Sequence, residues 1–379
     1  MHERPRDVKR TCAACALLAL AAAAACGGAS EPQPVAGQVR LAFVGDTNGY
    51  NIADDPLLEG RDLLAGVDKV LDDVDLFVFN HEGTLIEPAD APSRCRTYET
   101  QSTFAGSPAF ANRLTVRTRA LATMANNHAM DCGPEGLAQT RQALDEAGIL
   151  TVGAGSSLDE ACRPVELAIN GVDIAFFAYF VQDLRGVLGE VVATAGRPGV
   201  ATMEGCGAEA AVKAVAPRTV VVVSLHTHVG PSWTYDTAPE FVSAVRRLLE
   251  SGADVVVAHG PHFPQGVLAE GDGLAFLSLG NFMFRPGYVM EPEAHQSLLA
   301  VLGLGEAGVT EARLYPVEVT QEGLPVLAQG PTSQEILALV GELSKEYGVT
   351  IAAEDGFGLV TRRVASERNT SGLPPPSGR

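Results

Sequence analysis

The sequence predicts a mixed α/β fold in which strands and helices alternate along the chain. The first observation behind this prediction is that apolar runs typical of buried strands recur between segments with helical spacing. The second is that polar residues with metal-binding side chains stand directly after several of these runs. Because strands hold the loops at their ends rigidly, a site is expected where these residues gather.

The elements follow from local patterns along the chain. The runs predicted to be strands are residues 39–45, 75–80, 120–124, 165–170, 172–180, 220–225, 254–258, 274–279, 297–304 and 308–319. Asn170 and Gly171 favour a tight turn, so the fourth and fifth runs are predicted to pair as a hairpin. The last two runs are predicted to form a closing hairpin.

Apolar residues at helical spacing predict the helices between these strands. The predicted helices are residues 62–71, 108–114, 133–147, 208–216, 239–251 and 333–347. Residues 87–107 and 186–205 are rich in Pro, Ser or Gly, so we expect an excursion loop and an irregular segment there.

The charge balance argues against one class of partner. The 379 residues contain 27 basic and 46 acidic side chains, for a net charge of −19. Neutralising phosphates requires clustered Lys and Arg, so nucleic acid is not an expected partner. The hydrophobic fraction of 46% is enough for a large buried core.

Residues 1–25 are predicted to be a signal peptide of the lipoprotein type. Four basic side chains among the first ten residues precede an apolar stretch that is shorter than the about 20 residues of a membrane-spanning helix. The stretch closes with alanines on Cys26, a pattern that resembles a bacterial lipoprotein signal in which the cysteine is acylated. Ordinary cleavage near Ala25 is the alternative, and either route exports the chain.

The expected mature protein is a membrane-anchored lipoprotein that faces the periplasm or the cell surface. Residues 26–38 are predicted to be a flexible tether, residues 39–364 a single domain, and residues 365–379 a disordered tail. In an oxidising compartment the even number of remaining cysteines, Cys95, Cys132, Cys162 and Cys206, suggests two disulfides, with three connectivities open. Small buried thiols are the alternative.

Candidate metal ligands stand at or just beyond the ends of the apolar runs. They are Asp46, Glu82, Asn127, His226, His259 and His262. In a layered α/β fold such strand ends converge on one edge, where two carboxylates, an amide and several imidazoles would share a cleft. These ligands suit Mn, Fe or Zn, as one ion or as a pair that polarises a substrate oxygen and supplies hydroxide.

Three of these candidates also have a simpler interpretation. Asp46 or Asn127 could hold a turn by hydrogen bonding, and Glu82 could be a solvated loop residue. Asp131 is expected to accept a hydrogen bond from a histidine N–H and so to orient that ring.

Six segments in a fixed order resemble a known family. They are GDT (45–47), NHEGTL (80–85), ANNHAMDCG (125–133), SLHTHVG (224–230), GADVVVAHGPH (252–262) and SLGNF (278–282). Over about residues 40–284 they resemble the CapA family of capsule-synthesis proteins, named for poly-γ-glutamate production. That family is similar to calcineurin-type metallophosphoesterases. The resemblance therefore implies a four-layer α/β/β/α sandwich with a two-metal centre.

The resemblance also implies roles for individual residues. Asp46, Asn127, His226 and His262 match metal ligands, Glu82 takes the place of the residue that bridges two metals, and His128 matches the histidine that protonates the leaving group. The chain departs from the phosphoesterase pattern at Asn48, where a histidine is usual. It also departs in the spacing of His259 and His262, which two residues separate.

Residues on the substrate side are predicted more coarsely. Ser278 and Asn281 are expected to shape the cleft floor. Arg285, with Arg94 and Arg96 in the excursion loop, is a cation expected to meet a substrate carboxylate.

Two functions of different class follow. The first is an exported metal-dependent hydrolase or transferase that acts on an envelope polymer such as poly-γ-glutamate or on its precursor. The second is a noncatalytic capsule-assembly or polymer-binding subunit on the same fold, which works with membrane proteins of capsule synthesis. A general metallophosphoesterase is a further alternative. The acidic chain favours a small local site or a polymer other than a polyanion.

Overall fold

The computed structural model describes residues 37–90, 95, 103–114, 118–181, 190–217, 219–227, 229–230, 232–286 and 289–362. These residues all fall in one compact unit of the chain. The predicted signal peptide, Cys26, residues 26–36 of the tether, the tail, Arg94 and Arg96 lie outside the described residues. Among the described residues, no helix is both long enough and apolar enough to cross a membrane.

The larger sheet has ten strands, and its central strands end at the candidate ligands. Their order is β19-β20-β17-β16-β1-β2-β5-β6, with β15 beside β1 and β18 beside β17. The bounds are β1 (Val39–Thr47), β2 (Leu76–His81), β5 (Arg119–Thr123), β6 (Ile149–Val152), β15 (Asn281–Met283), β16 (Gln296–Gly305), β17 (Gly308–Val319), β18 (Pro325–Leu327), β19 (Val349–Ala353) and β20 (Gly358–Arg362). Strands β1, β2, β5 and β6 are parallel, and β16 and β17 form the predicted closing hairpin.

The second sheet has six strands in the order β13-β14-β12-β11-β9-β8. The bounds are β8 (Val165–Ile169), β9 (Val172–Val181), β11 (Val220–Thr227), β12 (Val255–His259), β13 (Val267–Glu270) and β14 (Gly273–Phe276). The four inner strands are parallel, and β8 pairs with β9 as the hairpin that Asn170 and Gly171 predict.

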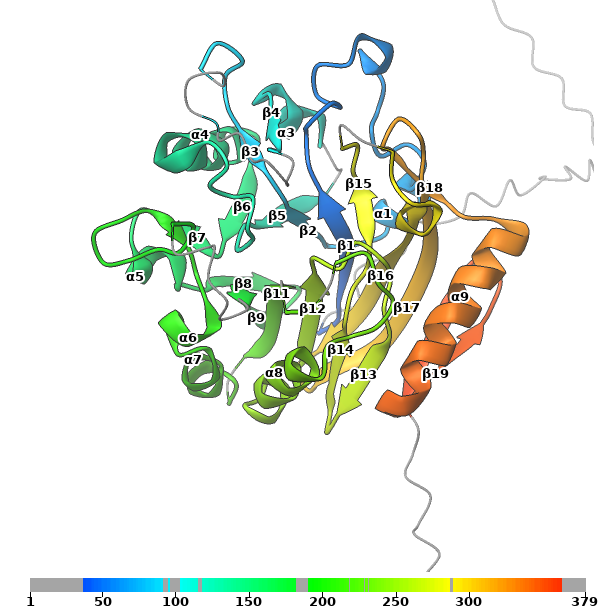
Figure 1. The fold of residues 1–379 in the computed structure, drawn as a ribbon. Helices are drawn as coiled ribbons and strands as arrows, with labels where there is room; N and C mark the ends of the chain where they lie inside the picture. Colours follow the sequence, from blue (N-terminus) through cyan, green and yellow to red (C-terminus); the bar gives the residue numbers. More distant parts are fainter. Residues whose placement is uncertain are drawn as a thin grey trace, which may run out of the picture. The chain divides into compact units, whose positions relative to one another are not determined.

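The two sheets face each other, with helices on their outer faces. Along β11, Val220 and Val222 belong to the core that the two sheets share, whereas Val221 and Val223 pack against the outer helices. This alternation is the period of two that a strand imposes on its side chains. Figure 1 shows α7 (Ala208–Val215) and α8 (Pro239–Glu250) beside the smaller sheet, and α3 (Ala109–Arg113) and α4 (Gly133–Glu146) beside the larger one. The predicted four-layer α/β/β/α sandwich is confirmed.

The remaining elements are short or lie near the ends of the described chain. They are η1 (Pro56–Leu58), α1 (Asp68–Leu71), β3 (Thr84–Leu85), β4 (Ala105–Gly106), β7 (Ala154–Gly155), α5 (Leu158–Ala161), β10 (Gly199–Val200), α6 (Met203–Cys206), η2 (Pro292–His295), α9 (Gly330–Ser344) and η3 (Lys345–Tyr347).

Several bounds differ from the prediction. The helix predicted at residues 62–71 is only the single turn α1, because Gly66 lies against β18, where a Cβ would be 2.3 Å from the Pro325 carbonyl oxygen. The strand predicted at residues 274–279 ends at Phe276, since Ser278 and Gly280 form a turn with Gly280 at φ +77°.

Two disulfides form between the four predicted cysteines. Cys95 pairs with Cys132, and Cys162 pairs with Cys206. The first bond ties the loop after β5 to the excursion loop. The second links the ends of α5 and α6.

Candidate metal centre

The six predicted ligands are buried together at the carboxyl ends of strands from both sheets. The larger sheet supplies Asp46 from β1, Glu82 directly after β2, and Asn127 after β5; the smaller sheet supplies His226 from β11, His259 from β12, and His262 from the following loop. Because neighbouring parallel strands end at the same edge, residues from distant parts of the sequence meet here.

Asp46 is the centre of this group. Its Oδ1 lies 3.6 Å from His259 Nδ1 and 4.0 Å from His226 Nδ1, and its Oδ2 lies 3.4 Å from His262 Nδ1. Asp46, Glu82 and His262 each offer a ligand atom, and the three atoms lie within 4.8 Å of one another. Glu82 Oε1 lies 3.6 Å from His226 Nε2.

Two glycines let the backbone approach the group closely. Gly45 precedes Asp46 and lies so near Gly280 that a Cβ would be 1.9 Å from the Gly280 carbonyl oxygen. Gly260, at φ +107°, donates its N–H to Asp46 Oδ2 at 3.3 Å, and a Cβ there would be 2.3 Å from the Thr227 carbonyl oxygen. A side chain at either position would push the strand ends apart.

Buried polar atoms without hydrogen-bond partners test whether a cation fits. Among the described residues, both carboxylate oxygens of Glu82, Oδ1 of Asn127 and Nδ1 of His259 are buried and accept or donate no hydrogen bond. A buried polar atom left this way costs roughly 1–3 kcal/mol, and a divalent cation would be a partner for all of them. The donor set therefore fits a metal ion.

The structure excludes the simpler interpretations of Glu82 and Asn127. Glu82 is 0% exposed, so it is not a solvated loop residue. The turn after β5 is held by Asn126 instead of Asn127, since Asn126 Oδ1 accepts the N–H of His128 at 3.1 Å.

The site's charges perturb the pKa values of its carboxylates. Burial alone would raise the pKa of Asp46, but a hydrogen bond with His262 and the charges of His226, His262 and His259 hold it well below the usual range. Burial, with a smaller contribution from the charge of Asp46, raises the pKa of Glu82 to about 7. Glu82 is therefore partly protonated near neutral pH.

The histidines respond to the same charges. Burial would lower the pKa of His262, but the charge of Glu82 and the hydrogen bond with Asp46 raise it to about 9. Burial lowers the pKa of His259, and Asp46 offsets only part of that effect. Asp46 and Glu82 therefore favour the protonated ring of His262, whereas burial favours the neutral ring of His259.

His262 is fixed by a hydrogen bond and by a stacked aromatic ring. Its Nδ1 hydrogen-bonds Asn281 Oδ1 at 2.9 Å, and Trp233 stacks on the ring with centroids 4.4 Å apart. Both His262 and Trp233 have a φ of +61°, a conformation that non-glycine residues rarely adopt. Such backbone strain persists where surrounding contacts over-determine it, as at functional sites.

His128 and Asp131 form a second pair beside the ligands. Asp131 Oδ2 lies 2.8 Å from His128 Nδ1 and accepts the N–H of Phe104 at 2.8 Å. Burial would lower the pKa of His128, but the adjacent Asp131 carboxylate raises it. The Phe104 ring lies 4.4 Å from the imidazole. The structure thus places Asp131 where the sequence predicts a partner for an imidazole N–H.

Asn80 is a residue of the site that the sequence analysis did not single out. Its Nδ2 donates to Asp46 Oδ1 at 2.8 Å and lies 3.2 Å from His226 Nδ1, so it links ligands of both sheets. Its Oδ1 accepts from Asn126 at 3.1 Å. The alternation of side chains along a strand was the sequence signal that could have identified Asn80, because Asn80 shares a face with Glu82 whereas His81 points the other way.

The predicted substrate-side residues divide into two groups. Ser278 and Asn281 are buried and bonded internally: Ser278 Oγ accepts from Gly280 N, and Asn281 Nδ2 donates to the Ala294 carbonyl. Arg285 lines a neighbouring pocket, where it forms an ion pair with Asp55. Asn48, at the position where the phosphoesterase pattern has histidine, is buried and its Nδ2 has no hydrogen-bond partner among the described residues.

The sequence of residues 40–286 matches the family model described as bacterial capsule synthesis protein PGA_cap. The chain belongs to this family. It is 29% identical over 205 residues to the capsule biosynthesis protein CapA of Bacillus anthracis, a match that covers 53% of this chain and 48% of that protein. It is 26% identical over 235 residues to the PGA biosynthesis protein CapA of Bacillus subtilis, which covers 61% of this chain and 59% of that protein.

These matches span only about half to three-fifths of the length of those two relatives. Among solved structures, a 5'-nucleotidase precursor from Thermus thermophilus aligns with a TM-score of 0.38 and 15% identity, over 80% of this chain and 58% of that one. The assignment to the CapA family, predicted from the six segments, is confirmed by the family match.

Proposed function

We propose that this protein is an exported, metal-dependent hydrolase or transferase that acts on a polymer of the bacterial envelope or on its precursor. The observation that carries the proposal is the set of buried ligand atoms without hydrogen-bond partners at the strand ends, on Glu82, Asn127 and His259. The names of the two CapA relatives support capsule biosynthesis as the setting. Membrane proteins of capsule synthesis are the proposed partners.

Each group of residues has a distinct task in this proposal. Asp46, Glu82, Asn127, His226, His259 and His262 would hold one or two ions of Mn, Fe or Zn. A divalent ion bound there supplies Lewis acidity that polarises a substrate oxygen and lowers the pKa of water. Asn80 and Asn281 orient the ligands through the hydrogen bonds described above.

His128 is the proposed proton donor to the leaving group. Its Nδ1 is bound to Asp131, which leaves Nε2 as the nitrogen that can transfer a proton. The Asp131 carboxylate favours the protonated ring, and Phe104 covers one side of it. A positioned acid of this kind contributes about 10²–10⁴-fold in rate.

A metal analysis tests the centre itself. The mature chain, with Cys26 replaced by Ser and purified without chelator, should contain one or two equivalents of transition metal. Asp46→Asn should lose that metal because it removes the charge nearest to three histidines. Asp173→Asn, an exposed carboxylate on β9, is the matched control and should keep it. Equal and negligible metal in all three proteins would overturn the proposal.

A noncatalytic subunit is the second candidate, and Asn48 favours it because a usual ligand is missing there. His128→Asn separates the two functions. If the protein is an enzyme, this variant keeps its metal and loses hydrolysis of model phosphoesters and γ-glutamyl amides, together with capsule complementation. If His128→Asn folds, keeps its metal and restores capsule fully, the catalytic role is wrong.

The membrane anchor is proposed from the sequence alone. Acylation of Cys26 by two chains gives stable anchoring, whereas one chain is marginal. Mass spectrometry of the native N-terminus should find a diacylglyceryl group on Cys26. An unmodified N-terminus that begins after Ala25 would contradict lipidation and leave export intact.

A further inference from the structure

Trp233, the only tryptophan of the chain, stacks on the candidate ligand His262. The ring centroids are 4.4 Å apart, and the ring planes differ by 23°. Trp233 comes from the loop after β11 and is partly exposed, whereas His262 comes from the loop after β12 and is buried. The stack therefore joins the loops that follow two neighbouring strands of the smaller sheet.

The backbone holds these two residues in matching conformations. The Trp233 N–H donates to the carbonyl of Pro261, the residue before His262, at 2.8 Å. Both Trp233 and His262 have a φ of +61°, which is costly for large side chains. Because a hydrogen bond and a stack link the two loops, each loop helps to hold the strained conformation of the other.

Gln265 fixes the loop that carries Trp233. The Gln265 side chain is buried, and its Nε2 donates to the carbonyls of Thr234 at 3.1 Å and Asp236 at 3.0 Å. Its Oε1 accepts the hydroxyl of Thr237 at 2.8 Å. A ring on a loop bonded in this way is a rigid surface, and a rigid neighbour can orient a metal ligand.

The hydrogen bond and the stack constrain His262 in different ways. Asn281 Oδ1 fixes the position of His262 Nδ1 at 2.9 Å, but the ring can still rotate about that contact. Stacking on Trp233 fixes the plane of the ring. The orientation of the second ring nitrogen, Nε2, therefore depends on Trp233.

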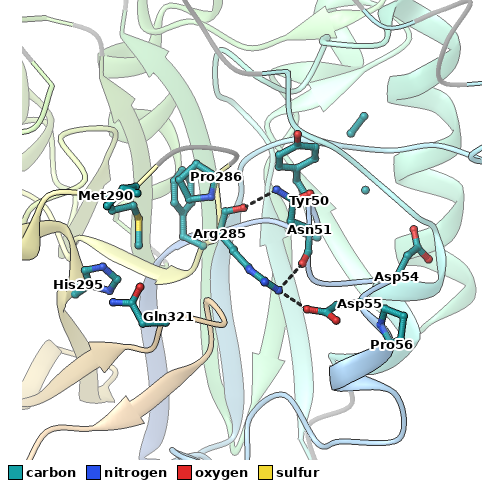
Figure 2. A pocket seen from close by; sticks show the side chains of 15 residues that line it. Tyr50, Asn51, Asp54, Asp55, Pro56, Arg285, Pro286, Met290, His295 and Gln321 are labelled. Atoms are coloured by element: carbon teal, nitrogen blue, oxygen red, sulfur yellow. Dashed lines mark hydrogen bonds and ion pairs between the residues drawn. The ribbon is translucent and has the colours of Figure 1, made fainter.

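His262 has a second aromatic neighbour, which belongs to a pocket. The Phe284 ring lies 5.1 Å from that of His262, and Phe284 is part of the lining of a pocket of about 750 Å³. Figure 2 shows this pocket, where Arg285 is paired with Asp55. Trp233 is not among the described residues that line the pocket, so the stack lies outside it.

We propose that Trp233 is a positioning residue of the metal centre, which holds the His262 ring in the orientation that a cation needs and thereby raises the metal affinity. The inference rests on the proposed function and adds a residue that lies outside the six segments that resemble the family. Outer partners that orient a metal-binding histidine typically contribute roughly 10- to 100-fold to metal affinity. Because stacking is weaker than a hydrogen bond, we expect about tenfold for Trp233.

Trp233→Gly removes the ring and keeps the path of the backbone, because glycine adopts a positive φ without strain. The Zn²⁺ affinity of the metal-free mature chain is measured by competition with a chromophoric chelator. Trp233→Gly should raise the Kd for Zn²⁺ about tenfold, and Trp233→Phe, which keeps a ring, should restore most of the affinity. Asn170→Gly is the matched control, since Asn170 also has a positive φ, of 51°, in the turn before β9 at the far end of the sheet. It should bind Zn²⁺ as the wild type does.

Fluorescence gives a second measurement, because emission from the only tryptophan comes from the ring that contacts His262. Adding Co²⁺ to the metal-free wild type should quench this emission, and prior addition of Zn²⁺ should prevent the quenching. Asp46→Asn should show no quenching, since it loses the metal. This measurement uses Trp233 itself and does not depend on the folding of a Trp233 variant.

Three results would overturn the inference: equal Zn²⁺ affinity of Trp233→Gly and Asn170→Gly, no recovery of affinity in Trp233→Phe, or Co²⁺ binding without quenching. The wild type separates this test from that of the proposed function. A wild type that binds neither Zn²⁺ nor Co²⁺ refutes the metal centre and the role of Trp233 with it. A wild type that binds Zn²⁺ no better than Trp233→Gly refutes only the role of Trp233.

Discussion

The hydroxyl of Tyr179 should destabilise the protein, so Tyr179→Phe is expected to stabilise it. Tyr179 lies on β9, is 0% exposed, and its hydroxyl has no hydrogen-bond partner among the described residues. Burial accordingly raises the pKa of this phenol. The substitution removes one oxygen and leaves the ring stacked on Phe177, with centroids 5.9 Å apart.

The magnitude follows from the penalty for an unsatisfied buried group. That penalty is roughly 1–3 kcal/mol, so we expect the free energy of unfolding to rise by at least about 1 kcal/mol. For residues 39–362, about 2.1 cal/mol/K per residue gives an unfolding entropy of about 0.7 kcal/mol/K. Each kcal/mol then raises the Tm by about 1.5 °C.

Tyr235→Phe is the matched control because it makes the same chemical change with the opposite expected sign. The Tyr235 hydroxyl donates to Gln296 Oε1 at 2.9 Å, and its loss should cost about 0.5–1.5 kcal/mol. Urea unfolding followed by fluorescence, with a calorimetric Tm, measures both variants. If Tyr179→Phe loses as much stability as Tyr235→Phe, the Tyr179 hydroxyl is bonded in solution and the reasoning is wrong.

Three further predictions concern pH, metal and the proton donor. Hydrogen bonds from Ser156 and Arg141 lower the pKa of Glu160 from 4.5 to about 2. Glu160→Gln should therefore reduce the free energy of unfolding at pH 7. In urea titrations the difference between wild type and variant should vanish as the pH falls through about 2. A chelator should lower the Tm of the wild type in calorimetry and leave that of Asp46→Asn unchanged; an equal effect on both would argue against a metal at Asp46. Asp131→Asn should keep the metal content, lower the hydrolysis rate by about 10²-fold or more and change its pH profile, because His128 loses its orienting carboxylate. An unchanged rate would contradict the role of Asp131 in orienting His128.

Strand ends were the most predictable part of the site. An apolar run that stops at Asp46 or His226 marks a buried strand and its polar end in the sequence itself. Asn80 was not predicted because an asparagine inside a strand pattern gives no sign of what lies opposite. Its partner His226 stands 146 residues away, on the other sheet.

Short strands at or near the sheet edges were the least predictable. Strands β13, β19 and β20 have four or five residues each and depend on pairing for their existence, so their local sequence carries a weak signal. The predicted helix at residues 333–347 begins at Gly330 instead, since a proline in its first turn is compatible with a helix start. A tertiary contact limits α1 to a single turn, because the backbone at Gly66 meets β18.

The division of the ligands between two sheets has a consequence for folding. Asp46 and His262 are far apart in the sequence, and in the unfolded chain the six side chains are dispersed. They converge only after the six-stranded sheet has docked on the ten-stranded one. A cation that needs all of them is captured late and only by the docked arrangement. Binding of the proposed metal ion would then slow the separation of the two sheets and lengthen the lifetime of the folded molecule.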